Sequence, residues 1–83
     1  MARKMKYINF ENIGLVIFET NVNHDSMRQL VGHNAISAGF CSFPNKDENG
    51  NEARCYGRST TLRLDSAPED TQRLQQILNP YGW

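Results

Sequence analysis

The sequence lacks any apolar stretch long enough to cross a membrane. None of its 83 residues belongs to a run approaching the roughly 20 apolar residues that a spanning helix needs. The N-terminus is basic, but the apolar stretch that follows at residues 7–10 is short and interrupted by Asn9, so it does not resemble a signal peptide. These absences predict a cytoplasmic protein without a membrane partner.

An excess of charge of either sign is also lacking. Lys plus Arg and Asp plus Glu each number 9, so the formal net charge is zero. Strong nonspecific binding to nucleic acid needs many unopposed cations, and the composition argues against it. The basic residues are nevertheless unevenly placed, and two groups of them stand out: Arg3, Lys4 and Lys6, and later Arg54, Arg58 and Arg63.

Cysteine is scarce, and the two that are present do not make a disulfide framework. Cys41 and Cys55 fall on the two arms of an expected hairpin, nearly opposite each other. A stable zinc site needs about four ligands, and only His24 and His33 could join the two thiols. The spacing therefore favours two reduced, half-buried thiols over a disulfide or a metal site, and no metal is expected.

Motifs for phosphate binding and for nucleophilic catalysis are missing as well. The glycines form neither a G-x-x-x-x-G-K loop nor a G-x-G-x-x-G turn. No G-x-S-x-G elbow surrounds a serine, and no pattern ties a hydroxyl or thiol to either histidine. The sequence thus assigns no catalytic residue and no cofactor.

What the first half of the chain does contain is a hairpin followed by a helix. Residues 7–11 alternate apolar and polar side chains, and residues 15–18 form a β-branched and aromatic run, which is typical of strands. Gly14 supplies turn chemistry between them. Asn23 is a good N-cap and Gly32 a good C-terminal stop, so a helix is predicted over 24–31.

The second half repeats this plan with different residues. Residues 35–43 and 53–64 are predicted strands, joined by a polar loop over 44–52. Ser66 and Glu69 have the spacing of a capping box and predict the start of a second helix, which ends at Asn79-Pro80. The aromatic tail, residues 81–83, is expected to fold back on the core.

The order of elements is therefore ββαββα, an α+β fold. The economical arrangement is a four-stranded, mostly antiparallel sheet with both helices packed on one face. Residues 7–83 make a single small domain of two hairpin–helix units, and residues 1–6 are a flexible basic lead-in. The second face of the sheet is left for solvent or for a partner.

A candidate binding surface lies on the last predicted strand. Arg54, Tyr56, Arg58 and Thr60 alternate onto one side of it, and interleaved cations and aromatics suit single-stranded nucleic acid or a phosphorylated ligand. Arg3, Lys4 and Lys6 could extend this surface. The alternative is an ordinary solvated face whose cations pair with acids, or, if this side meets the helices, a Tyr56 that belongs to the core.

Three stretches, Ser37-Ala38-Gly39-Phe40, residues 55–62 from Cys55-Tyr56-Gly57, and residues 66–70, resemble small uncharacterised proteins encoded by bacteriophages and prophages. The resemblance implies a small accessory protein of a mobile element that acts by binding a component of the host or of the phage. It carries no site residue over to this chain.

Three hypotheses about function follow from the sequence. The first is a non-enzymatic binding protein that uses its open sheet face or an edge strand on a protein partner or on a second copy of itself. The second is a nucleic-acid-binding accessory factor that uses the basic and aromatic residues. The third is a small enzyme or ligand-binding domain with a site at Cys41, Cys55, Ser59 or His24.

Overall fold

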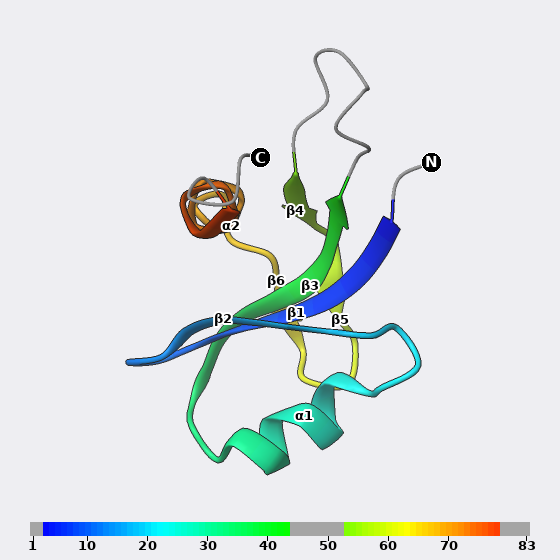
Figure 1. Cartoon of the computed structure of the whole chain (residues 1–83). Helices are drawn as coiled ribbons and strands as arrows, with labels where there is room; N and C mark the ends of the chain where they lie inside the picture. The colour runs from blue at the N-terminus through cyan, green and yellow to red at the C-terminus, as the bar shows by residue number, and fades with distance from the viewer. Residues whose placement is uncertain (1–2, 44–52, 79–83) are drawn as a thin grey trace.

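Four strands form one antiparallel sheet in the computed structural model, which describes residues 3–43 and 53–78 (Figure 1). The strand order is β2-β1-β3-β4, so the two longest strands lie in the middle. The α+β class, the antiparallel four-stranded sheet and the two helices are as predicted. The elements in chain order are β1 (Arg3–Phe10), β2 (Gly14–Phe18), α1 (His24–Val31), β3 (Ala35–Phe43), β4 (Arg54–Tyr56), β5 (Arg58–Ser59), β6 (Leu64–Asp65) and α2 (Asp70–Leu78).

The N-terminal residues belong to the sheet, and the prediction of a flexible lead-in over 1–6 is wrong for residues 3–6. The strand β1 begins at Arg3, which pairs with Phe43 at the far end of β3. A nine-residue β3 offers backbone partners along all of β1, and the basic side chains at this end remain exposed or half-buried. Basic character therefore does not exclude these residues from a strand.

The two helices cover opposite faces of the sheet, whereas the sequence predicted both on one face. Neighbouring side chains of a strand point to opposite faces, and Tyr7 and Ile8 are both fully buried. Tyr7 belongs to the cluster that includes Leu74 of α2, and Ile8 to the cluster against which Met27 of α1 packs. A central strand that is apolar on both sides needs a cover on each.

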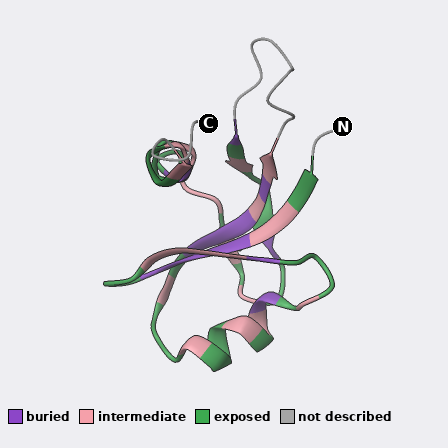
Figure 2. Ribbon diagram, in the orientation of Figure 1, coloured by how far each residue is buried: buried purple, intermediate pink, exposed green. Residues whose placement is uncertain are grey.

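The core is accordingly divided into two clusters, one on each side of the sheet. Figure 2 shows that many of the buried residues lie in the second half of β1 and in the middle of β3. The buried members on the α2 side are Tyr7, Cys41, Ala53 and Leu74. Those on the α1 side are Ile8, Phe10, Phe18 and Ala38.

The helix α1 has the predicted bounds, 24–31. Asn23 precedes it in an extended conformation, although its side chain makes no capping hydrogen bond. Gly32 ends it with φ at 76°, in the left-handed region, and its N–H donates to the carbonyl of Arg28 at 2.9 Å. The apolar stripe of the helix, which includes Met27 and Val31, packs against the sheet.

The predicted strand over 53–64 is not continuous. It breaks at Gly57, whose φ is +77°, and the chain then forms the separate hairpin β5–β6. Gly39 of β3 makes the close approach possible, since a Cβ there would lie 2.5 Å from the carbonyl oxygen of Tyr56. The β5–β6 hairpin adds Leu62 and Leu64 to the core on the α1 side.

The helix α2 begins at Asp70, one residue beyond the predicted capping box. The Asp70 carboxylate accepts a hydrogen bond from the N–H of Ala67 at 3.0 Å. The N–H of Ser66 donates instead to the carbonyl of Gly57. An acid in the first turn thus organises the start of this helix, in place of the serine. The predicted loop over 44–52 and the tail over 81–83 lie outside the described residues.

Candidate binding face

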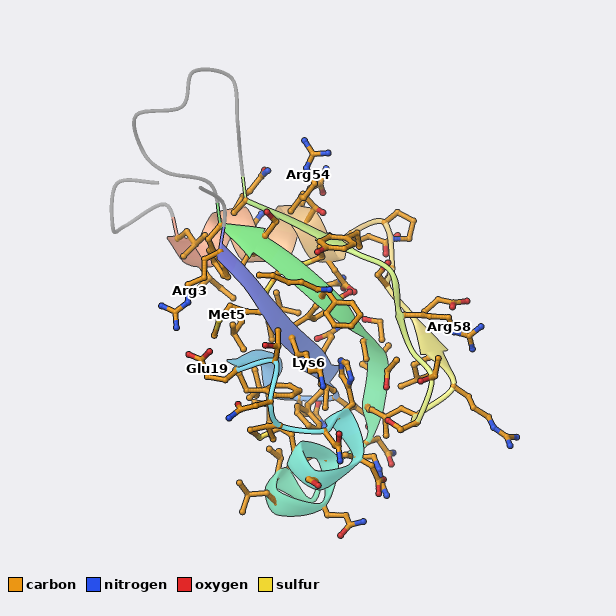
Figure 3. All side chains as sticks on the ribbon, turned by 90° about the vertical axis from the view of Figure 1, so that its right-hand side faces the viewer. Arg3, Met5, Lys6, Glu19, Arg54 and Arg58 are labelled. Atoms are coloured by element: carbon orange, nitrogen blue, oxygen red, sulfur yellow. The ribbon has the colours of Figure 1, made fainter. Side chains whose placement is uncertain are left out.

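Two rows of side chains cross the sheet on the side of α1, at the end away from the body of that helix (Figure 3). In the first row Lys6 of β1 pairs with Phe40 of β3, which pairs with Tyr56 of β4. In the second row Lys4 pairs with Ser42, and Ser42 with Arg54. Residues directly opposite each other on paired strands point to the same face. We call this set the basic-aromatic face: Lys4, Lys6, Phe40, Ser42, Arg54 and Tyr56.

The centre of the face is a pair of stacked rings. Phe40 and Tyr56 have ring centroids 6.1 Å apart and an interplanar angle of 29°. The ammonium group of Lys4 lies over the Phe40 ring, 4.3 Å from its centroid, at a distance that permits a cation–π interaction. Phe40 is half-buried while 38% of Tyr56 is exposed, so the tyrosine ring is the accessible aromatic surface.

The cations of this face are held to different degrees. Lys6 is half-buried, and its ammonium group donates a 2.8 Å hydrogen bond to the carbonyl of Val22. Lys4 and Arg54 are exposed. None of the four strands of the sheet contains an acidic residue within the part of the chain that the structure describes. The face therefore carries three cations and no acid on its own strands, although the net charge of the chain is zero.

His24, the first residue of α1, packs beside Phe40 on the same side of the sheet. Its ring meets Phe18 and Phe40 edge-on, with centroid distances of 5.5 and 5.8 Å. The Nε2–H group donates to the carbonyl of Gly39 at 2.8 Å, which requires the tautomer protonated at Nε2. Burial lowers the pKa of His24, and the nearby ammonium of Lys6 lowers it further. The lowered pKa favours the uncharged form of the His24 ring, which packs against Phe40.

Three of the predicted site residues lie elsewhere. Arg3 follows the opposite alternation from Lys4 and forms an ion pair with Glu19. Arg58 lies beyond the break at Gly57, where its guanidinium is 3.5 Å from a carboxylate oxygen of Asp65. Thr60 is exposed in the turn that joins β5 to β6. The structure thus brings together Lys4, Lys6, Arg54 and Tyr56 from the predicted set.

Phe40 and Ser42 are members of the face that were not predicted from the sequence. Both lie on β3, which was predicted as a strand but was not considered as part of a binding surface. The available signal was the register: once Cys41 is placed opposite Cys55, their neighbours Phe40 and Tyr56 must also be opposite each other. Lys4 and Lys6 were predicted as an extension of the surface, but their assignment to a lead-in gave them no partners in the sheet; the register of β1 and β3 supplies these partners.

Cys41 and Cys55 lie directly opposite each other in the register of β3 and β4, and both are free thiols. Burial raises the pKa of each to about 12, so both thiols are protonated near neutral pH and are poor nucleophiles. Within residues 3–43 and 53–78, no three His, Cys, Asp or Glu side chains are grouped so that they could hold a metal ion. The hydroxyl of Ser59 lies within hydrogen-bonding distance of the Thr61 hydroxyl and accepts from the N–H of Leu62.

Comparisons of the chain with models of protein families, with characterised proteins and with solved structures found no match. In the part of the chain that the structure describes, neither helix has the length and apolar character that crossing a membrane would require. The candidate face is therefore inferred from the geometry of this chain alone.

Proposed function

We propose that this protein is a non-enzymatic accessory binding protein whose basic-aromatic face binds single-stranded nucleic acid. The observation that carries the proposal is the placement of Lys4, Lys6 and Arg54 around a stacked aromatic pair on an open part of the sheet. The origin in a phage or prophage and the cytoplasmic location remain predictions from the sequence.

The chemistry of a single strand fits both components of the face. Its phosphates attract the three cations, and its unpaired bases can stack on the exposed ring of Tyr56. Stacking of one base on an aromatic side chain is worth about 1–3 kcal/mol. A duplex keeps its bases paired and stacked, so it would use only the cations. Binding should therefore favour single strands over duplexes.

The expected affinity is modest, because only three cations contribute. With a slope of about 0.7 per phosphate contact for single strands, log K should fall with log salt concentration with a slope of about −2. Dissociation constants of about 10⁻⁶ to 10⁻⁴ M at physiological salt are typical of such sequence-independent contacts. The zero net charge is compatible with this weak, local mode of binding.

An acidic segment of a protein is the competing ligand, since it would satisfy the same cations. It offers carboxylates but no flat bases, so its binding should depend little on the ring of Tyr56. Replacing Tyr56 by Phe keeps an aromatic surface and replacing it by Leu removes that surface. A ligand that stacks should distinguish these two variants, and a ligand that binds only through charge should not.

The test is fluorescence anisotropy of a labelled oligonucleotide titrated with the whole chain, using single-stranded and duplex forms over a range of salt. We expect the double variant Lys4→Gln/Arg54→Gln to bind the single strand at least about tenfold more weakly, since each lost phosphate contact is worth roughly 1 kcal/mol. Tyr56→Leu should also weaken binding, and Tyr56→Phe should not.

The matched control is Arg58→Gln, which removes an exposed cation that lies off the face and is already paired with Asp65. It should change the affinity by less than about twofold, because Arg58 lies in the separate β5–β6 hairpin and not on the face. Equal losses in Arg58→Gln and Arg54→Gln would contradict the proposed face. No binding of the single strand at low salt, together with binding of an acidic peptide, would favour the protein-binding hypothesis.

A further inference from the structure

The strand β2 forms one edge of the sheet and has no neighbour on its outer side within residues 3–43 and 53–78. Its five residues, Gly14–Phe18, read GLVIF. Edge strands are usually protected by a Lys, a Pro, a bulge or extreme shortness, because their unpaired N–H and C=O groups attract other strands. This strand has none of these protections.

At β2, both core clusters are packed against side chains that are only partly covered. Leu15 and Ile17 pack against the cluster on the α2 side, and Val16 packs against the cluster on the α1 side. All three are only half-buried. A strand added at this edge would therefore cover apolar surface on both faces of the sheet at once.

We propose that β2 pairs with β2 of a second copy of this chain, antiparallel and about a two-fold axis. The register centred on Val16 pairs all five residues and sets Val16 opposite its own equivalent, Leu15 opposite Ile17, and Gly14 opposite Phe18. Every other symmetric register pairs fewer residues. No charged residue lies within the strand, so no like charges face each other.

Self-complementarity is the reason to choose a second copy over a different protein. An aromatic side chain opposite a glycine compensates for the missing side chain, and the two-fold arrangement makes this pair twice. A chain of this size buries only about 60–65% of its unfolded surface, so it gains from any further burial. The two-fold axis is perpendicular to the sheet. The α1 side of one copy therefore lies on the same side of the joined sheet as the α1 side of the other copy.

The two four-stranded sheets would then form one continuous sheet, with both basic-aromatic faces on the same side. Dimer formation does not depend on the proposed function. If that function holds, two weak sites on one surface would bind a long strand more tightly than a short one, because the second contact becomes intramolecular.

The first test is the molar mass of the untagged chain by sedimentation over a wide concentration range. The proposal expects a rise from 9.5 kDa toward twice that value. The second test is the Val16→Cys variant, treated with a mild oxidant and analysed on a non-reducing gel. Residues directly opposite in paired strands have the spacing that a disulfide requires.

The control is Leu30→Cys, whose position on α1 is 80% exposed and outside the proposed contact. Paired thiols reach effective concentrations in the millimolar range, so Val16→Cys should crosslink at least about tenfold faster than Leu30→Cys at micromolar protein. The unsubstituted chain measures the background from the native cysteines. A mass of 9.5 kDa at every concentration would overturn the proposal. A dimer in which Val16→Cys crosslinks no faster than the control would overturn it as well.

Discussion

The hydroxyl of Tyr7 donates a 2.6 Å hydrogen bond to the carboxylate of Asp70, 63 residues further along the chain. Both side chains are fully buried. The same carboxylate oxygen accepts from the hydroxyl of Ser37 at 2.7 Å, and the second oxygen accepts from Arg73 at 3.1 Å. Burial and the carboxylate of Asp70 raise the pKa of Tyr7. This network joins β1, β3 and the start of α2.

Removing the Tyr7 hydroxyl should therefore destabilise the fold. We expect Tyr7→Phe to lower the free energy of unfolding by about 1.5–3 kcal/mol, the usual range for a hydrogen bond to a charged group. The measurement is urea denaturation at pH 7. Asp65→Asn is the control, since it removes an exposed acid paired with Arg58 and should cost less than about 1 kcal/mol. Equal costs in the two variants would contradict a structural role for the network.

The sequence allowed the helix α1 to be predicted better than the placement of α2. The bounds of α1 were correct because Asn23 and Gly32 are strong local signals on either side of an apolar stripe. The placement of α2 depends on a contact between residues 7 and 70, which no local pattern encodes. The prediction of both helices on one face failed for the same reason.

The candidate site shows a similar division. Tyr56 and Arg54 were identified because alternation along a strand is a local property. The alternation could not be extended to Arg58, since Gly57 takes a positive φ that ends the strand. Phe40 entered the site only through the register of β3 and β4, and the register of β1 and β3 placed beside it the two lysines that the sequence had offered as an extension of the surface.

Gly39 should be one of the least replaceable residues of the chain. A Cβ at this position would lie 2.5 Å from the carbonyl oxygen of Tyr56, and a backbone atom cannot move aside cheaply. We expect Gly39→Ala to lower the free energy of unfolding by on the order of 1–3 kcal/mol through overpacking. Ser42→Ala in the same strand is the comparison and should cost less. An unfolding midpoint of Gly39→Ala equal to that of the native chain would show that β4 does not pass this close to β3.

Stability should decrease as the pH falls below the ordinary histidine pKa of 6.5, because folding lowers the pKa of His24 through burial. Between the lowered pKa and 6.5 the unfolded chain binds more protons than the folded chain, so the free energy of unfolding rises with pH. The contribution of His24 is complete above 6.5 and is lost progressively below it. Its slope is at most about 1.4 kcal/mol per pH unit.

The measurement is urea denaturation at several pH values between 5.5 and 7.5. In His24→Gln the amide can still donate to the Gly39 carbonyl but does not titrate, so the curve of stability against pH should become flatter. The same slope in the variant and in the native chain would assign the pH dependence to other groups.

Cys41 and Cys55 should form a disulfide without rearrangement of the strands. They are directly opposite in the register of β3 and β4, where the Cα–Cα distances of about 4.5–5.5 Å fall within the range that a disulfide needs. Oxidation by diamide should lower the mass of the intact chain by about 2 Da, the mass of the two thiol hydrogens, as each thiol loses one hydrogen to the reagent. Cross-linking a loop of this size typically stabilises a protein by about 3 kcal/mol.

The reaction should be slow in the native chain, because both thiols have a pKa near 12 and Cys41 is fully buried. Urea at a concentration below the unfolding transition should accelerate it, since β4 is a three-residue edge strand that can open locally. Cys55→Ala is the control and should show no loss of 2 Da. A rapid reaction in the absence of urea would show that the thiols are accessible, and would contradict the packing of β4 against α2.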